Sequence, residues 1–255
     1  MTEAAITSIY NKLFKWEGKS AKAPYPIHKK LNTVAFGYDD IYKWILYNYQ
    51  FNSDSKVLDA GCGVGYGSLL IAETKQCQVK GISLSDAEIL QATQFSKEKN
   101  LEHLVTFKVK SYDTLEPNTF DFIIATESVK HSLNLKMTLK SLINALKPNG
   151  TLIIVDDFLT NETYSNSIKS YQKDWQLAEL LTASDVLPPF RLKKDLTDFV
   201  QTKSNLKLHL SIILLSVLKQ INSVATIMRG GLYLEKLFNE GVMKYYIIDF
   251  KKPNQ

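Results

Sequence analysis

The sequence contains little cysteine, and its cysteines are not arranged as a motif. Among 255 residues there are two, Cys62 and Cys77. Two thiols provide neither a metal-ligand spacing nor the disulfide framework of a small secreted domain, so we expect no metal site and a reducing compartment. The first residues also lack the basic and then apolar order of a secretion signal. Both absences predict a cytoplasmic protein.

Long apolar runs are missing as well. The longest apolar stretch, residues 206–228, is interrupted by Lys207, His209, Lys219, Gln220 and Asn222. It is too polar to span a bilayer unaided, and we expect no stable membrane insertion. Its many aliphatic residues are typical of the core of a helical cap. The alternatives are an apolar pocket wall and an association surface, which includes a homo-oligomer interface.

The sequence also lacks a strong excess of charge of one sign. The formal net charge is +5, both signs are interspersed, and no run of five like charges occurs. Such a mild excess does not indicate a nucleic-acid surface, and we expect no nucleic-acid partner. The length suits one α/β domain with insertions, which is large enough to bury a sizeable core.

Strands and helices are predicted to alternate from residue 56 onward. Short apolar runs predict strands over 57–60, 79–82, 105–109, 120–125 and 151–156, a last strand at 245–250, and helices over 86–99 and 135–146. This alternation predicts a Rossmann-like α/β fold, with a doubly wound, mostly parallel sheet, an aromatic-rich N-terminal segment and a helical cap insertion.

The chain divides into four predicted parts. Residues 1–50 are expected to form an N-terminal helical lid, residues 51–159 a ligand-binding Rossmann-like core, residues 160–230 a mostly helical cap, and residues 231–255 the final strands. Within the cap, amphipathic segments at 175–181 and 192–200 predict helices, and Leu187-Pro188-Pro189 predicts a turn.

A glycine loop, Gly61-Cys62-Gly63-Val64-Gly65, follows the first predicted strand. Glycines let a ligand approach the backbone closely, and the following helix offers free N–H groups at its start. Dinucleotide-binding proteins use a similar loop, so the loop alone is a weak signal. The acidic Asp59 just before it suits a cationic or amino-bearing ligand better than a pyrophosphate.

Five segments in order resemble the motifs of class I S-adenosylmethionine-dependent methyltransferases. They are Val57–Gly65, Val79–Ser85, Val109–Asp113, Phe120–Ile124 and Leu146–Leu152. The Gly-Ile-Ser-Leu-Ser pattern at 81–85 is similar to the branch of sterol methyltransferases, cyclopropane fatty acid synthases and tocopherol methyltransferases. The resemblance implies that the core binds S-adenosylmethionine as cofactor.

The same resemblance assigns cofactor roles to single residues. It implies that the glycines approach the methionine half, that Asp59 orients the loop and reaches the amino group through water, that Tyr112 lies against adenine, and that Asp113 accepts from the adenine amino group. Ser83, followed by Leu84, stands where many relatives have an acidic ribose ligand. Glu88 is then either the ribose contact or the second half of a capping box with Ser85, and we weigh these alternatives equally.

Two candidate catalytic residues, Glu127 and His131, follow the fourth predicted strand, where parallel sheets bind ligands. The branch has a similar glutamate-to-histidine pattern. We expect His131 to handle a proton and Glu127 to orient it or to face developing charge. Purely structural roles are the alternative for both, and Lys130 departs from the acidic residue common in the branch.

The acceptor is expected to be small and largely apolar, such as an isoprenoid, a lipid, a sterol-like molecule or an aromatic secondary metabolite. The aromatic first fifty residues and the aliphatic cap predict its surroundings, with Tyr38 and Trp175 as candidate contacts. The alternatives are a methyltransferase acting on nucleic acid or protein, and a cofactor-binding protein without catalysis.

Overall fold

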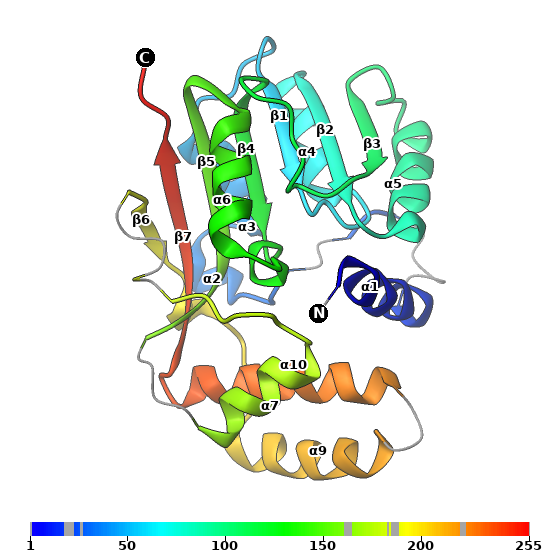
Figure 1. Ribbon diagram of the computed structural model, residues 1–255, viewed down its shortest axis with the longest axis vertical. Helices are drawn as coiled ribbons and strands as arrows, with labels where there is room; N and C mark the ends of the chain where they lie inside the picture. Colours follow the sequence, from blue (N-terminus) through cyan, green and yellow to red (C-terminus); the bar gives the residue numbers. More distant parts are fainter. Residues whose placement is uncertain are drawn as a thin grey trace.

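The computed structural model describes residues 2–17, 23–25, 28–160, 165–182, 184, 189–219 and 223–254. These residues form a seven-stranded sheet in the order β3-β2-β1-β4-β5-β7-β6 (Figure 1). Neighbouring strands from β1 to β5 are parallel, and β7 is antiparallel to β5 and β6. The strands are Lys56–Ala60, Gln78–Ser83, Val105–Val109, Phe120–Thr126, Leu146–Leu159, Arg191–Asp195 and Met243–Lys251. The predicted Rossmann-like class is confirmed.

The helices are named in chain order. They are α1 (Glu3–Glu17), α2 (Thr33–Phe36), α3 (Ile41–Asn48), α4 (Tyr66–Lys75), α5 (Asp86–Glu98), α6 (Leu135–Ala145), α7 (Asn166–Asp174), α9 (Asn205–Leu218) and α10 (Ser223–Asn239). Two short 3-10 helices, η2 (Val129–His131) and η3 (Thr197–Phe199), lie in loops. The helices predicted at 86–99 and 135–146 are confirmed to within one residue.

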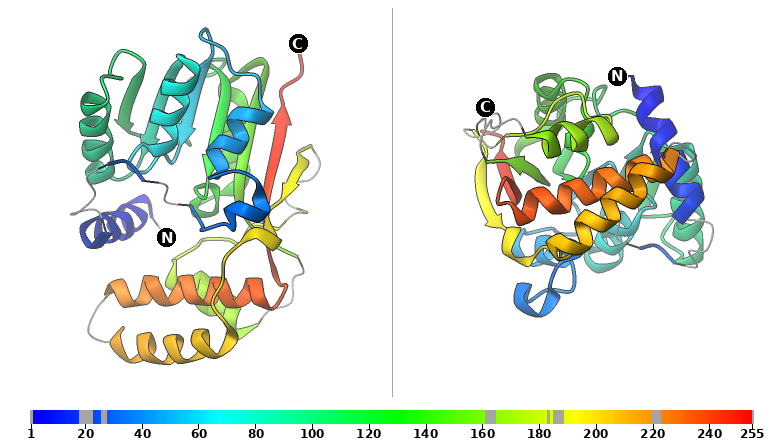
Figure 2. Two further views of the ribbon diagram at one scale, coloured as in Figure 1. Left: turned by 180° about the vertical axis from the view of Figure 1, so that it is seen from behind. Right: turned by 90° about the horizontal axis from the view of Figure 1, so that it is seen from below.

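Helices cover both faces of the sheet because alternate strand residues point to opposite sides. Val57 of β1 and Ile124 of β4 pack into a core with α3, α4 and α5. Their neighbours Leu58 and Ile123 pack with α6 on the other face. Figures 1 and 2 show α6 on one side of the sheet and α3 and α4 on the other. Both faces of the sheet are therefore packed against helices, and its carboxyl edge is left for a ligand.

A helical cap lies beyond the carboxyl ends of the parallel strands. In it α10 packs against both α7 and α9, and the crossing of α9 and α10 is visible in Figure 2. Helix α1 contacts α5 of the core and α10 of the cap. Residues 30–32 are hydrogen-bonded to residues 199–201. The N-terminal segment thus connects the sheet to the cap.

Two predictions about the cap are corrected by the structure, and a third falls partly outside the described residues. Residues 192–200 are not a helix, because Arg191–Asp195 pair with β7 as an edge strand and Arg191 binds Asp249. Helix α7 ends before the predicted helix at 175–181, since Gln176 adopts a left-handed φ of 51°. Leu187 and Pro188 of the predicted turn lie outside the described residues.

The apolar stretch 206–228 is divided between two helices of different burial. The part of the stretch in α10 buries Ala225 and Ile227, whereas α9 buries only Leu208 among its side chains. The expectation that the whole stretch is cap core is therefore wrong for α9. No helix in the described parts of the chain is both long and apolar enough to cross a membrane.

Candidate functional site

A cavity of about 1180 Å³ lies between the carboxyl edge of the sheet and the cap. The loops after β1, β2 and β4 line one end, and α9 and α10 line the other. Helix α1 contributes Tyr10 and Phe14 to its wall. Because ligands of open parallel sheets bind beyond the carboxyl ends of the strands, we treat this cavity as the candidate site.

Most of the predicted cofactor residues meet at the glycine-loop end of the cavity. The residues from the prediction that line it are Gly61, Gly63, Ser83, Leu84, Glu88 and Tyr112. The hydroxyl of Tyr112 donates to the carbonyl of Ser128 at 3.1 Å, which holds the ring in place. The structure therefore brings together loops from three different strands around one volume.

Glu88 is oriented by Ser83. The Ser83 hydroxyl donates to Glu88 Oε2 at 2.7 Å, and burial raises the pKa of the Glu88 carboxyl although this hydroxyl lowers it. Ser85 caps α5 by accepting from the Glu88 amide at 3.2 Å, but its own amide donates to Ser83. The second half of the capping box is thus absent here, and the Glu88 carboxyl lines the cavity instead.

Asp59 and Gly65 support the loop from behind instead of lining the cavity. Asp59 is fully buried and accepts from Ser68 Oγ at 2.6 Å and from Tyr42 Oη at 3.4 Å. Burial raises the pKa of Asp59 to about 6 against these two donors. Gly65 has a φ of 84°, and a Cβ there would lie 2.6 Å from the Phe107 ring. Both residues shape the loop through protein contacts.

Two further predicted site residues also lie away from the cavity lining. Asp113 accepts a hydrogen bond from the hydroxyl of Thr138, so its carboxyl anchors α6. Tyr38 packs its ring against Phe36 and Tyr47. Neither contact was visible in the sequence, because each depends on residues brought together by the fold. Trp175, the other predicted acceptor contact, does line the cavity.

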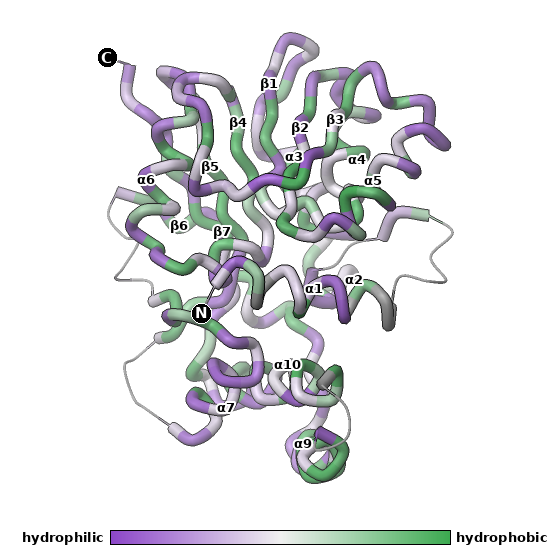
Figure 3. The backbone as a smooth tube through the Cα atoms, turned by 45° about the vertical axis from the view of Figure 1, so that its right-hand side comes forward, coloured by the Kyte–Doolittle hydropathy of each residue, from purple (hydrophilic) through white to green (hydrophobic). Residues whose placement is uncertain are grey.

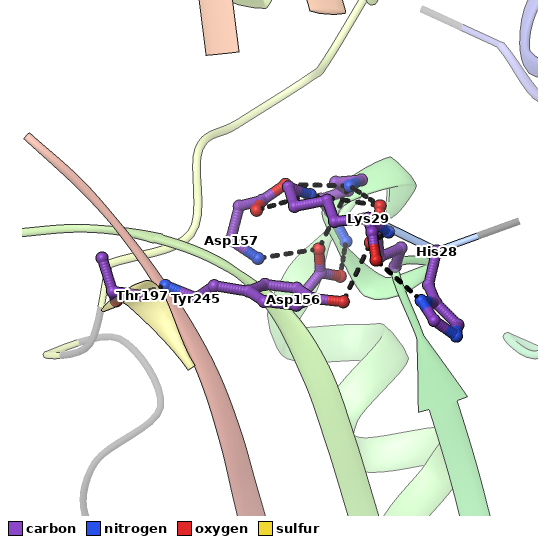
Figure 4. Close-up of polar contacts among 8 residues, drawn as sticks. His28, Lys29, Asp156, Asp157, Thr197 and Tyr245 are labelled. Carbon is purple, nitrogen blue, oxygen red and sulfur yellow. Dashed lines mark hydrogen bonds and ion pairs between the residues drawn. The ribbon is translucent and has the colours of Figure 1, made fainter. Parts of the chain in front are cut away.

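Glu127 is the centre of a buried ion cluster, of which Figure 4 labels Lys29, Asp157 and Tyr245. Its Oε1 accepts from the Lys29 amide at 2.7 Å and from Tyr245 Oη at 2.9 Å. Its Oε2 lies 3.1 Å from Lys29 Nζ and 3.2 Å from Lys130 Nζ. Both ammonium groups also bind Asp157, at 2.7 and 2.9 Å. Every oxygen of Glu127 is thus already engaged by the protein.

The ionisation of this cluster follows from its charges. Burial alone would raise the pKa of Glu127, but Lys130 and Lys29 hold it well below its usual range. Burial alone would lower the pKa of Lys130, but the carboxylates of Asp157, Glu127 and Asp156 raise it. Glu127 is therefore an ionised, fully paired carboxylate, which is poorly suited to accept a proton from an acceptor.

His131 lies in the cavity wall between two aromatic rings. Its ring centroid is 5.3 Å from that of Tyr10, edge to face, and 5.8 Å from that of Trp175. Burial, with a further contribution from Lys130, lowers the pKa of His131 to about 3. The imidazole is therefore neutral, and its buried Nε2 has no hydrogen-bond partner among the described residues.

Trp175 and His28 add two more unpaired polar atoms to the cavity wall. The indole Nε1 of Trp175 and Nε2 of His28 are buried, and neither has a hydrogen-bond partner in the part of the chain that the structure describes. His28 Nδ1 is fixed by the carbonyl of Lys29 at 2.9 Å. Sequence reasoning missed His28, Lys29 and Tyr10, because the only signal was the general aromatic and basic character of the first fifty residues. Together these atoms form a polar spot in a mostly apolar wall.

Comparison with known proteins gives a family. Residues 51–224 match the family model described as a methyltransferase domain. A sterol 24-C-methyltransferase of Schizosaccharomyces pombe is 25% identical over 160 residues, which cover 62% of this chain and 41% of that protein. A 24-methylenesterol C-methyltransferase of Arabidopsis thaliana is 27% identical over 143 residues, covering 55% and 39%. The chain thus spans about two fifths of the length of these curated relatives.

Solved structures share the whole fold at low identity. The [4+2]-cyclase SpnF superposes with a TM-score of 0.76 at 17% identity, covering 100% of this chain and 97% of that one. Geranyl diphosphate C-methyltransferase from Streptomyces coelicolor A3(2), solved with geranyl diphosphate and S-adenosyl-L-homocysteine, superposes with a TM-score of 0.74 at 14% identity, covering 98% and 97%. At these identities the likeness establishes the fold, including its cap.

The ion cluster makes a testable contribution to stability. Glu127→Gln keeps the shape of the side chain but removes its negative charge, so the buried ammonium groups of Lys29 and Lys130 lose one carboxylate partner. Such a loss lowers the free energy of unfolding by about 3 kcal/mol. Because the pKa of Glu127 is lowered by folding, its contribution is present above its unfolded pKa of about 4.3 and is lost as pH falls. Urea unfolding should show the full deficit at pH 7 and a smaller one at pH 3.

Glu235→Gln is the matched control, because Glu235 pairs with the half-exposed Lys203. Exposed pairs contribute about 0–1 kcal/mol, so this variant should unfold nearly as the wild type does. Equal stability of the two glutamine variants would show that the Glu127 cluster is not a stabilising core element.

Proposed function

Because the chain belongs to the methyltransferase-domain family, we propose that it transfers the methyl group of S-adenosylmethionine to a small, largely apolar acceptor. Its cofactor is S-adenosylmethionine, and it is a methyltransferase. The observation that carries the acceptor class is that this cavity joins the glycine loop to a wall of aliphatic and aromatic side chains.

The glycine-loop end fits the cofactor by its donor set. Glu88 is a buried carboxylate with one protein donor, Ser83, so it has lone pairs left for the ribose hydroxyls. Leu84 and Tyr112 offer apolar and aromatic surface for the adenine. Gly61 and Gly63 leave space for the methionine half against the backbone. Asp59 and Asp113 contribute indirectly: Asp59 supports the glycine loop, and Asp113 anchors α6.

The opposite end suits an apolar acceptor with one polar group. Leucine, isoleucine and phenylalanine side chains of α9 and α10 line it, as do Tyr10, Phe14 and Trp175. The unpaired Nε2 of His131 and Nε1 of Trp175 offer hydrogen bonds to a polar atom of the acceptor. Isoprenoids, sterol-like molecules, other lipids and aromatic metabolites satisfy this description. Relatives named for sterols and for geranyl diphosphate support it.

The reaction then depends mainly on alignment and exclusion of water. Bound S-adenosylmethionine supplies a methyl group that is already activated on a sulfonium. Holding an acceptor in line with it gains about 7–11 kcal/mol relative to free encounter. The glycine loop and Glu88 position the nucleoside, while the cap and α1 enclose the acceptor. His131, neutral at physiological pH, orients the acceptor by a hydrogen bond, and Glu127 holds the loop that presents His131.

Two other activities are tested by the same experiments. One is a protein that binds the cofactor without methyl transfer, and a structure that shares the fold is named as a [4+2]-cyclase. Methylation of nucleic acid or protein is the other. The largely apolar wall favours a small molecule over either polymer, because a polymer needs a polar approach.

Cofactor binding should stabilise the protein. S-adenosylhomocysteine at about a hundred times its Kd should stabilise the fold by about 2.7 kcal/mol, measured as a rise in Tm, since only the folded state binds. NAD should produce no rise. Gly63→Val and Gly63→Asn should both lose the rise, and asparagine tolerates the left-handed φ of 52° at this position. A folded Gly63→Asn protein with wild-type affinity would contradict the placement of the cofactor.

His131→Ala should slow single-turnover methyl transfer by about tenfold, the effect of one lost hydrogen bond of ~1–1.5 kcal/mol. With the pKa of His131 near 3, the imidazole stays neutral above pH 5, so the wild-type rate should be flat from pH 6 to 9 as far as His131 is concerned. The exposed His103 provides the control variant, His103→Ala, with an unchanged rate.

General-base catalysis by His131 predicts a different result. In that case His131→Ala would lower the single-turnover rate by a factor of about 10²–10⁴. The wild-type rate would also change with pH as His131 titrates, and this change would be missing in the alanine variant. Such a pH dependence would show that His131 takes a proton in the reaction and would contradict a purely orienting role.

A further inference from the structure

Helix α9 has more exposed apolar surface than any other described element. Leu206, Leu210, Ile213 and Val217 follow the spacing i, i+4, i+7, i+11, which places them on one face of the helix, and they are 70%, 59%, 50% and 62% exposed. Leu214 and Leu218 extend this face. Elsewhere in the described chain, large exposed apolar side chains are scattered over different elements, as on ordinary protein surfaces.

The position of α9 explains why this face is bare. Its main partner is α10, and it lies at the end of the molecule farthest from the sheet, with α10 in between (Figures 1 and 3). One side, centred on Leu208, packs inward, and the other points away from the protein. A helix that is apolar around most of its circumference needs a second covering surface.

The charges around this face are basic. The sequence from Phe199 to Leu234 contains no aspartate or glutamate. Of its lysines and arginine, Lys203 pairs with Glu235 and the buried Arg229 pairs with Asp174, so the positive charge at this face comes from Lys207 and Lys219. Lys207 and Lys219 lie exposed at the two ends of α9. An apolar helical face bordered by lysines is suited to the interface of an anionic bilayer, where acyl chains cover the leucines and lipid phosphates meet the ammonium groups.

The same helix borders the cavity. Ser211, Leu214 and Leu215 of α9 line the cavity wall, as does Met228 of α10. Leu214 and Met228 are also exposed at the surface, at 60% and 39%. The apolar surface is therefore continuous with the acceptor end of the cavity, so a molecule dissolved in a bilayer would reach that end without crossing water.

We propose that the exposed face of α9, defined by Leu206, Leu210, Ile213 and Val217, docks on anionic lipid bilayers and that the acceptor enters the cavity from the bilayer beside Leu214. The helix lies in the plane of the interface and does not cross the membrane. The entry step rests on the proposed function, whereas the docking step does not, because it needs neither cofactor nor acceptor.

The test measures binding of the purified chain to vesicles by sedimentation, without cofactor or acceptor. Vesicles of phosphatidylcholine with phosphatidylglycerol should bind the wild type more strongly than vesicles of phosphatidylcholine alone, and added salt should weaken binding by screening the lysines. Leu210→Gln/Val217→Gln should partition at least about tenfold more weakly, because it removes two inserted side chains. Lys207→Glu/Lys219→Glu should lose the preference for anionic vesicles.

Leu90→Gln/Met137→Gln is the matched control, since Leu90 and Met137 are 74% and 65% exposed on α5 and α6. It should bind vesicles as the wild type does. Each variant should keep the wild-type response to S-adenosylhomocysteine, which separates loss of docking from loss of the fold or the cofactor site. If methyl transfer fails but vesicle binding occurs as described, only the proposed function is contradicted.

Two results would overturn the docking proposal. The first is a failure of the vesicle test: either the wild-type protein does not sediment with anionic vesicles, or Leu210→Gln/Val217→Gln binds them as strongly as the wild type does. The second is a dimer in sedimentation velocity that Leu210→Gln/Val217→Gln converts to a monomer, which would show that a second copy of the chain covers α9.

Discussion

The architecture of the site depends on the ion cluster around Glu127. It ties together the segment before α2, the loop after β4 and the strands β5 and β7 through Lys29, Lys130, Asp157 and Tyr245. Charges buried this deeply cost several kcal/mol each unless all are paired, so the cluster is satisfied only when these four segments are in register. Glu127 itself adopts a left-handed φ of 51°, and the sharp turn there directs the following residues, including His131, toward the cavity.

The cluster also determines which charges the cavity wall presents to an acceptor. Because Lys29 and Lys130 are neutralised by carboxylates, and because burial and Lys130 keep His131 uncharged, the acceptor end presents no free ion from these groups. A largely apolar volume suits a reaction whose donor already carries the activation. The same apolar character continues onto α9, so the cavity wall and the exposed helix follow from one aliphatic stretch of sequence.

The sheet could be predicted from the sequence because its signal is local. Runs such as Phe120–Ala125 are apolar on both faces, and the glycine loop marks where the first strand ends. The site could be predicted only partly, because motif position fixes the backbone but not the direction of a side chain. Gly63, Glu88 and His131 line the cavity, whereas Asp59 and Asp113 turn to Ser68 and Thr138. The edge strand β6 and the exposure of α9 depend on tertiary neighbours, which a periodic pattern does not contain.

The central claim is that the methyl group ends on a small apolar molecule. The most direct test supplies S-adenosylmethionine labelled in its methyl group, together with a cell extract separated into lipid, small polar, nucleic-acid and protein fractions. We expect the label to appear in an organic-soluble small molecule, identified by mass spectrometry, and Gly63→Asn to abolish this labelling. Label in nucleic acid or protein, or no enzyme-dependent label in any fraction, would contradict it.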